Sequence, residues 1–450
     1  MKRKERILIA ALLGVLLLSL CVGIYWTHVK EKRTYEAPKE TATDIHVVLS
    51  TSDFSDIFHE KVIVTSDQPF RVCYANVTEY KEAGEIVEIT EESAIEDIYM
   101  LTPQKGASLQ VLSISRGYGS PKYEGALEII NTLGGLVLVN QVSVETYLRY
   151  VVPSEMPASY GAEALKAQAV CARNFAYQHI LNPSYPAFDA DLDDSIRYQV
   201  YNNSEPHTAC DQAISDTAGV VLQYGEELVN TYYYSTSWGF TTDATLWGGG
   251  ALPYYQSRHV GEEDDRPDLT DEEVFRQVMN REGDGDYTDY EETEVWYRWE
   301  TTVGAGRILE NLKEMNYDTS GALTGISVSG RRAGGSVSKL RVQFDSHEIV
   351  LTAESEIRKC FWPKEEELKR NDGSVLQGYE KLPSSFFYID VNQNENQTVA
   401  SVTIHGGGCG HGLGMTQNGA KKLAEIGFTY ADILDYFYPG TACVKERFGV

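Results

Sequence analysis

Residues 151–180 hold one acidic side chain in a proline-flanked turn, directly ahead of a pattern that predicts a long helix. The acid is Glu155, in the string VVPSEMP, and the helix pattern runs from Gly161 to Ile180. Proline fixes its own φ angle and restricts the residue before it, so this carboxyl does not fit an ordinary solvated helix face. The alternative interpretation places Glu155 in a first helical turn, where an acid caps free N–H groups and complements the helix dipole.

Two basic residues on the following helix, Lys166 and Arg173, are seven positions apart and therefore share one stripe, two turns from each other. An apolar stripe on the same helix predicts core packing; it consists of Leu165, Ala169, Ala172 and Ala176. From spacing alone, the two cations are either solvated charges beside this stripe or cations that line a cleft near Glu155.

These strings resemble the SpoIID/LytB family, in which a glutamate in a P-x-E-M-P context precedes ALKAQAV-A-R. Further strings resemble the same family in the same order, spanning roughly residues 120 to 445: YEGALEIINTLGGLVLVNQVSVETYLRYVVPSEMP, YYYSTSWGFTTDATLWGG and HGGGCGHGLGMTQNGAKKLAEIGFTYADILDYFYPGT. The resemblance implies a lytic transglycosylase that cleaves peptidoglycan glycan strands between N-acetylmuramic acid and N-acetylglucosamine. In that activity Glu155 protonates the glycosidic oxygen, and as a carboxylate it then deprotonates the C6 hydroxyl of N-acetylmuramic acid, closing a 1,6-anhydro ring.

The resemblance also implies a set of substrate-binding residues, which are Lys166, Arg173, Tyr234, Ser235, Ser237, His411 and Gln417. From the residues alone, the alternating run from Tyr232 to Ser237 fits equally well a strand with one buried aromatic face. No G-x-S-x-G elbow surrounds these serines, which argues against a serine hydrolase.

A general acid needs a raised pKa, whereas nearby cations and a helix N-terminus lower the pKa of a carboxyl group. Desolvation by apolar and aromatic neighbours raises it. The proposed role therefore requires that such groups enclose Glu155, with Lys166 and Arg173 binding substrate at some distance from it. Ordinary glycosidases use two carboxyl groups, and the many other acids of this chain leave a second one open.

The glycine-dense string HGGGCGHGLG lacks G-K-[ST] and does not follow a Rossmann pattern, so its glycines indicate a backbone held close to a neighbour rather than a phosphate loop. His405, Cys409 and His411 are residue types that bind zinc, but no fourth ligand with suitable spacing is apparent. Some SpoIID-like proteins carry a cysteine and histidine cluster where this chain has DLDDSIRYQVY, residues 191–201, without either residue type. We therefore predict no metal site and no cofactor.

The N-terminus predicts a membrane anchor. Residues 1–6 form a basic cytoplasmic tail, residues 7–26 an apolar run long enough to span a bilayer, and residues 27–45 a polar linker. A cleaved signal peptide is the alternative; against it, the run is longer than a usual apolar region and ends in Tyr25 and Trp26. The prediction is a single-pass protein of the cell membrane, with residues 46–445 as an extracytoplasmic, SpoIID-like catalytic region.

Composition limits the classes of partner that the protein can bind, and the order of the predicted elements indicates the fold class. A net charge of −27 argues against nucleic acid, because phosphate binding requires concentrated Lys and Arg. The seven cysteines show no C-x-x-C pair and predict isolated thiols. An acidic stretch at about 261–294 predicts a solvated insertion. Strand pairs mixed with helices, without regular alternation, predict an α+β fold with a β-rich core and several helices.

Local signals predict individual elements. The string LGGLVLVNQVSV predicts a hairpin with Gly134 and Gly135 at or near its turn. Thr416 is a candidate cap for a helix over residues 417–426 that Gly427 ends, and Thr429 with Asp432 predicts a capping-box-like start of the next helix.

Two other functions remain open. A glycan-binding module that stimulates a separate cell-wall amidase without turnover would place a sugar in the same cleft, and a metal-dependent hydrolase would use His405, Cys409 and His411. The resemblance implies peptidoglycan as the main partner, with an amidase and other engulfment proteins as further partners, in sporulation or in cell-wall remodelling.

Overall fold

The computed structural model describes residues 43–75, 77–92, 98–104, 106–262, 267–282 and 288–445. The predicted tail and anchor, with all of the linker before residue 43, lie outside the described residues. Within the described part of the chain, no helix is both long enough and apolar enough to cross a bilayer.

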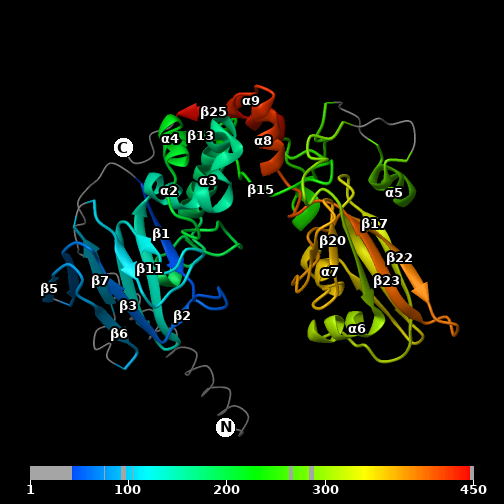
Figure 1. Ribbon diagram of the computed structural model, residues 1–450, viewed down its shortest axis with the longest axis horizontal. Coiled ribbons are helices and arrows are strands. Elements are labelled where there is room, and N and C mark those ends of the chain that lie inside the picture. Colours follow the sequence, from blue (N-terminus) through cyan, green and yellow to red (C-terminus); the bar gives the residue numbers. More distant parts are fainter. Residues whose placement is uncertain are drawn as a thin grey trace, which may run out of the picture. The chain divides into compact units, whose positions relative to one another are not determined.

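Two sheets form the N-terminal part of the fold (Figure 1). The first has eight strands, with β2 (Phe58–His59) paired to β11 beside the order β12 (Leu192–Asp193), β1 (Asp44–Leu49), β11 (Gly135–Ser143), β10 (Ala126–Thr132), β7 (Ile98–Pro103), β4 (Phe70–Tyr74), β5 (Val77–Lys81). The second has four, in the order β6 (Val87–Thr90), β3 (Lys61–Thr65), β8 (Leu109–Val111), β9 (Lys122–Tyr123). The hairpin predicted at Gly134 and Gly135 is confirmed, because Thr132 of β10 pairs with Gly135 of β11.

A helical layer follows β11 and includes the C-terminal end of the described chain (Figure 1). Its helices are α2 (Val144–Glu155), α3 (Ala162–Leu181), α4 (Thr208–Asp216), α8 (Gln417–Glu425) and α9 (Tyr430–Phe437). The central helix α3 contacts the other four, and its predicted apolar stripe is buried. A small sheet, β14 (Glu227–Leu228), β13 (Val220–Tyr224), β25 (Ala442–Lys445), joins this layer to the chain end. Residues 417–445 thus return to the region that carries Glu155.

The middle of the chain forms two further sheets around a separate apolar core. One has the order β21 (Val375–Leu376), β20 (Leu368–Arg370), β16 (Trp299–Gly304), β23 (Val399–Gly406), β22 (Phe387–Gln393), and the other β17 (Leu323–Arg331), β18 (Val337–Phe344), β19 (Glu348–Leu351). Their helices are α5 (Glu272–Asn280), α6 (Ala305–Glu314) and α7 (Glu354–Cys360). Several sheets with eight α-helices among the described residues confirm the predicted β-rich mixture of strands and helices.

Predicted helix ends near the C-terminus are largely confirmed. Helix α8 ends at Glu425, ahead of Gly427 with φ of 98°, and Thr429 with Asp432 forms the predicted capping box of α9. Thr416 occupies the N-cap position of α8, but its hydroxyl does not cap the helix.

The acidic stretch at 261–294, predicted to be a solvated insertion, has buried as well as exposed residues among those described. Leu269, Phe275 and Met279 are buried against Trp238 and Phe386 in one apolar cluster. The acids Asp289 and Glu291 are buried as well. Apolar residues at the spacing of α5 anchor this stretch despite its high acid content.

Candidate active site

Glu155 is the last residue of α2, so the interpretation that placed it in a first helical turn is wrong. Pro153 lies inside the final turn, and Met156 leaves the helix in an extended conformation with its amide donating to the carbonyl of Val152 at 2.9 Å. A one-turn 3₁₀ helix, η1 (Ala158–Tyr160), and Gly161 at φ of 92° separate Glu155 from α3. A helix C-terminus carries negative partial charge, which disfavours an ionised carboxylate.

The segment after β12 folds over this carboxyl. The backbone amide of Val200 donates to Oε1 of Glu155 at 2.6 Å. Ser154, one residue earlier, accepts from the amides of Asn203 at 3.0 Å and Ser204 at 3.1 Å, which fixes the same segment to α2. Residues 192–204 therefore form one wall around the carboxyl group.

A chain of three hydrogen-bonded side chains leads to Glu155; Tyr147 and Gln199 are buried, and Tyr233 is half-buried. Tyr147 donates to Oε1 of Gln199 at 3.2 Å, and Nε2 of Gln199 donates to the hydroxyl of Tyr233 at 3.0 Å. The Tyr233 hydroxyl is hydrogen-bonded to the Glu155 carboxyl. Because this hydroxyl accepts from Gln199, its own proton is directed at Glu155.

Burial raises the pKa of Glu155 to about 7, against the opposing effect of the hydrogen bonds from Val200 and Tyr233. Desolvation disfavours the charged form of a carboxyl, and a pKa near the working pH suits a group that gives and then takes a proton. The aromatic and apolar enclosure that a general acid requires is therefore present.

Glu155 lines a pocket of about 280 Å³, near the lower end of the ~300–1,000 Å³ range of small-ligand sites. The other lining residues are Phe175, Ile196, Arg197, Tyr198, Val200, Tyr232, Tyr233, Trp247 and His411. Glu155 is the one carboxylic acid among these described residues. The Trp247 ring is 50% exposed and lies 4.8 Å from the Tyr232 ring, centroid to centroid, which makes it an aromatic rim.

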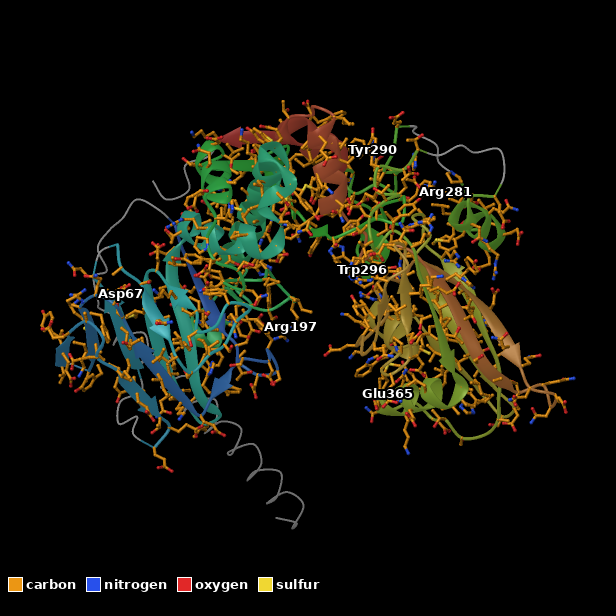
Figure 2. The ribbon with its side chains drawn as sticks, in the orientation of Figure 1. Asp67, Arg197, Arg281, Tyr290, Trp296 and Glu365 are labelled. Carbon is orange, nitrogen blue, oxygen red and sulfur yellow. The ribbon has the colours of Figure 1, made fainter. Side chains whose placement is uncertain are left out.

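Arg197 is the one lining residue with a permanent positive charge among those described. It extends from the loop after β12 (Figure 2), its side chain is 68% exposed, and it pairs with the buried Asp193 at 2.9 Å. The buried Asp193 thus holds the Arg197 guanidinium at the mouth of the pocket.

His411, predicted to bind substrate, lines the pocket, but both of its ring nitrogens are hydrogen-bonded to the backbone. Nδ1 accepts from the amide of Leu413 at 3.0 Å, and Nε2 lies 3.0 Å from the carbonyl of Tyr233. Burial lowers the pKa of His411 to about 4, so the ring is neutral at physiological pH. The imidazole therefore contributes its face and positions Tyr233.

The glycine-rich string is held close to a neighbour, as its composition indicates. Strand β24 (Met415–Thr416) pairs in parallel with β15 (Tyr233–Tyr234). Gly410 and Gly414 have φ of 115° and 78°, and a Cβ on them would lie 2.6 Å from Cβ of Tyr234 and 2.1 Å from the carbonyl oxygen of Tyr232. No other residue fits this approach, which sets His411 beside Tyr233.

The two predicted cleft cations lie elsewhere, which is a correction. The Arg173 side chain is fully buried and binds Glu145 with Nε at 2.7 Å and Nη2 at 2.9 Å. It also donates to the carbonyl of Val220, so it joins α3 to α2 and β13. Lys166 pairs with Glu163 at 2.9 Å and Asp216 at 3.3 Å. Neither residue lines the pocket of Glu155.

The hydroxyl-rich run also differs from its prediction. In the two-residue strand β15, Tyr233 faces the pocket while Tyr234 is 5% exposed. Ser235 bonds to Thr236 at 3.1 Å, and Ser237 is buried and donates to Glu291. None of Tyr234, Ser235 and Ser237 lines the pocket, because strand alternation and the turn after β15 direct them into the protein.

Gln417 acts behind the pocket. Its Nε2 donates to the backbone carbonyl of Glu155 at 2.9 Å, satisfying an acceptor that the end of α2 leaves free. One residue earlier, Thr416 donates to the buried Glu291 at 2.6 Å, and burial raises the pKa of Glu291 to about 8. Helix α8 thereby contacts the Glu155 turn directly.

The three residues with zinc-binding side chains do not share a site. His405 lies 2.9 Å from Glu300 and 3.2 Å from Asp390 and stacks on Tyr388. Cys409 is a free thiol next to the Tyr379 hydroxyl. No group of three or more potential metal ligands occurs in the described part of the chain, and all six cysteines there are free.

Several pocket residues escaped the sequence analysis. Tyr232, Tyr233 and Trp247 lie in the quoted YYYSTSWGFTTDATLWGG string. Residues 196–200 lie in the segment 191–201, which was mentioned only because it has no cysteine or histidine. The aromatic residues of both segments were the signal that could have identified them, because aromatic neighbours exclude water from a carboxyl group and so raise its pKa.

Comparison with family models matches residues 132–224 to SpoIID, described as stage II sporulation protein. This match contains Glu155 and the loop residues of the pocket. The chain contains a SpoIID domain. A second match, to a domain of unknown function (DUF8618), covers residues 242–414 and contains Trp247 and His411. The pocket therefore combines side chains from both matched regions.

Curated relatives carry related names. The chain is 26% identical over 299 residues to an amidase enhancer of Bacillus subtilis (strain 168), covering 65% of this chain and 40% of that protein. It is 25% identical over 322 residues to stage II sporulation protein D of the same organism, covering 67% and 75%. An uncharacterized protein of Brachyspira hyodysenteriae (strain ATCC 49526 / WA1) is 26% identical over 326 residues, with 72% of each chain covered. The aligned region thus spans about two fifths of the amidase enhancer.

Proposed function

We propose that this protein is a peptidoglycan lytic transglycosylase in which Glu155 acts first as general acid and then as general base. The observation that carries the proposal is one carboxyl with a pKa of about 7 in an aromatic pocket that has no second lining carboxyl among the described residues. Hydrolysis by the usual glycosidase route requires two carboxyl groups, roughly 5 to 9.5 Å apart. A single acid suits an intramolecular acceptor instead.

The reaction balances without water. Protonated Glu155 gives its proton to the oxygen between N-acetylmuramic acid and N-acetylglucosamine, and the bond from C1 of the muramic ring to that oxygen breaks. The C6 hydroxyl of the same ring then attacks C1, while the Glu155 carboxylate takes the hydroxyl proton. The products are a 1,6-anhydromuramyl end and a free N-acetylglucosamine hydroxyl, and the acid is regenerated.

The surrounding residues support both steps. The hydrogen bonds from Val200 and Tyr233 stabilise the carboxylate that forms after proton transfer. Burial favours the protonated form, so the carboxylate readily takes a proton back. The exposed Trp247 ring offers a stacking face for a sugar. Arg197 at the pocket mouth supplies a cation for the carboxylate of a muramic acid residue.

The test is product analysis with the purified full-length protein. Incubation with peptide-free glycan strands is expected to yield anhydromuramyl ends, detected by mass spectrometry, and Glu155→Gln is expected to abolish them. Glu227→Gln removes an exposed acid of the same protein and serves as the control. Products that carry reducing muramic acid ends would instead indicate hydrolysis and overturn the proposal.

A second candidate is a glycan-binding module that stimulates a cell-wall amidase, favoured by the name of one relative, amidase enhancer. In that case the wild-type protein and Glu155→Gln bind glycan strands equally, neither cleaves them, and both accelerate an added amidase. The same incubation, repeated with amidase, separates the two candidates. Either candidate function includes attachment to the cell membrane through residues 7–26. Either also includes a role in sporulation or in cell-wall remodelling.

A further inference from the structure

A row of aromatic rings continues from the Glu155 pocket beyond its walls. Phe175 and His179 are one turn apart on α3, and their ring centroids lie 4.6 Å from each other. The His179 ring meets the Tyr198 ring edge to face at 5.0 Å, and Tyr198 lies 6.2 Å from Tyr185. Phe175 and Tyr198 line the pocket, whereas His179 and Tyr185 do not. The row therefore joins the pocket to rings outside it.

A tight turn places Tyr198 at the mouth of the pocket. The Tyr198 amide donates to the carbonyl of Ser195 at 3.0 Å, which closes a β-turn with Ile196 and Arg197 at its central positions (Figure 2 labels Arg197). Asp193, buried at the end of β12, accepts from the amide of Ser195 at 2.8 Å and from Nη2 of Arg197 at 2.9 Å. The turn is thus fixed to the core before any ligand binds.

The tip of the turn exposes an apolar side chain beside a cation. Ile196 is 80% exposed and lines the pocket, although isoleucine is not a residue that turns favour. Among the described residues, the Arg197 side chain bonds through Nη2 alone, to Asp193 and, at 3.4 Å, to the hydroxyl of Tyr185. The methyl groups of Ile196 and the other donors of Arg197 are therefore open to a ligand.

Two polar groups of the aromatic row are also open. In the described part of the chain, the Tyr198 hydroxyl makes no hydrogen bond, and the His179 ring bonds through Nδ1 alone, 3.3 Å from Oγ of Ser184. Neither the hydroxyl nor Nε2 of His179 is a buried atom without a partner, so both reach solvent. Burial lowers the pKa of His179, so its ring is neutral at physiological pH.

This combination of groups matches the chemistry of a sugar ring. A pyranose has an apolar face of C–H groups, which packs on an aromatic ring, and a rim of hydroxyl groups, which bond to a phenol or an imidazole. The methyl of an N-acetyl group is small and apolar, like the surface that Ile196 offers. The Glu155 pocket itself, at about 280 Å³, is near the lower size limit of ligand sites, so a polymeric glycan extends beyond it.

We propose that Tyr198, His179 and Ile196 form a second sugar subsite, which binds an N-acetylhexosamine ring next to the ring held at Glu155. The identity of this ligand as a glycan of the cell wall rests on the proposed function. Arg197 lies between the two positions, because it lines the pocket and precedes Tyr198 in the turn. A glycan that fills both positions is bound more tightly than a single sugar.

The test measures binding to full-length Glu155→Gln, which holds glycan without cleaving it. The probes are N-acetylmuramic acid and a peptide-free tetrasaccharide of alternating N-acetylglucosamine and N-acetylmuramic acid, each followed by ligand-observed NMR titration. Tyr198→Ala in this background is expected to weaken tetrasaccharide binding about tenfold and to leave binding of the single sugar within about threefold. Tyr198→Phe keeps the ring and is expected to bind both probes within about threefold of the Tyr198 protein.

Matched variants control for the loss of an exposed side chain. Tyr80→Ala removes an exposed tyrosine on β5, outside the pocket, and is expected to change neither affinity. Ile196→Ser is expected to weaken tetrasaccharide binding about threefold. Ile86→Ser replaces another exposed isoleucine, 62% exposed and also outside the pocket, and is expected to leave it unchanged. Thermal unfolding verifies that each variant folds.

Undiminished tetrasaccharide binding by folded Tyr198→Ala, equal weakening of both probes, a loss in Tyr198→Phe equal to that in Tyr198→Ala, or absence of tetrasaccharide binding overturns the inference. Cleavage is measured separately with the protein that retains Glu155. Cleavage without binding that depends on Tyr198 leaves the proposed function standing and removes this inference, whereas such binding without cleavage does the reverse.

Discussion

The backbone amide of Val200 donates a 2.6 Å hydrogen bond to Oε1 of Glu155, across 45 residues of sequence. The donor is a backbone N–H, so among single substitutions at position 200 only proline would remove it. The hydrogen bond favours the ionised form, yet burial outweighs it and raises the pKa to about 7. The balance between these two effects determines how the protein responds to pH.

The first prediction concerns the pH profile of glycan cleavage. Because the reaction begins with protonated Glu155, kcat/KM is expected to be flat below about pH 7 and to fall about tenfold per pH unit above it. The measurement is initial-rate kinetics from pH 5 to 9, with circular dichroism to verify folding at each pH. A profile that rises through pH 7 would contradict the role of Glu155 as an acid.

The second prediction concerns stability. The folded-state pKa of Glu155 lies above that of an unfolded chain, near 4.5, so wild-type stability falls as pH rises from about 4.5 through about 7. Glu155→Gln lacks this ionisation and is expected to gain up to about 3 kcal/mol over the wild type above pH 7, with no gain below pH 4. Denaturant unfolding at pH 4 and pH 8 measures the difference.

Glu291→Gln is the matched control for that variant. Glu291 is also buried with a raised pKa, about 8, but it does not line the pocket. Its replacement is expected to raise stability in alkaline solution in the same way while leaving cleavage within about twofold of the wild type, since no reacting group is touched. If Glu291→Gln lost as much cleavage activity as Glu155→Gln, Glu291 would also take part in the proton transfer.

The third prediction concerns the effects of two neighbouring tyrosines of β15, Tyr233 and Tyr234, on the pH profile. Tyr233→Phe removes a hydrogen bond that lowers the pKa of Glu155, so the alkaline fall in activity is expected to move to higher pH. It also removes the shorter of the two hydrogen bonds that Gln199 Nε2 donates, leaving the one to the carbonyl of Ala172 at 3.4 Å, at a cost of about 1 kcal/mol in stability. Tyr234→Phe is the control, because the Tyr234 hydroxyl is buried without a partner among the described residues. An identical pH profile for both variants would refute the assignment of Tyr233.

The sequence predicted the regular elements near the site well, because their signals are local. The turn at Gly134 and Gly135, the apolar stripe of α3 and the capping box of α9 each depend on a few adjacent residues. Glu155 could be singled out for the same reason, since its prolines act on neighbouring backbone. Its position at the end of α2 rather than the start of a helix could not, because a proline is also tolerated inside the final turn.

The composition of the pocket depended on long-range packing. Tyr233 and Tyr234 differ only in which way a two-residue strand faces, and pairing with β24, some 180 residues later, decides that. Arg173 has the spacing of a cleft cation, but the partner that buries it, Glu145, comes from another helix. The acids of 261–294 indicated solvent exposure, yet the apolar residues between them determine the burial of that stretch.

The fourth prediction concerns the aromatic rim. Trp247 is 50% exposed and packs edge-on against Tyr232, so its outer face is free to stack on a sugar. Trp247→Ala is expected to raise KM for glycan strands about tenfold with kcat within about threefold, because the ring contributes binding but no proton transfer. Tyr80→Ala, an exposed aromatic on β5 away from the pocket, is expected to change neither. A fall in kcat alone would place Trp247 in the chemical step instead.

The fifth prediction concerns metal removal. Both ring nitrogens of His411 are engaged with backbone groups of Tyr233 and Leu413, and His405 faces Glu300 and Asp390 on the sheet, so a metal at either would have to break these contacts. Incubation with EDTA and dialysis is therefore expected to leave the cleavage rate unchanged, and added zinc to leave it no higher. Elemental analysis of the purified protein provides the independent measurement. Loss of activity on chelation, restored by stoichiometric zinc, would favour the metal-dependent hydrolase and require that His411 exchange its bond to Tyr233 for the metal.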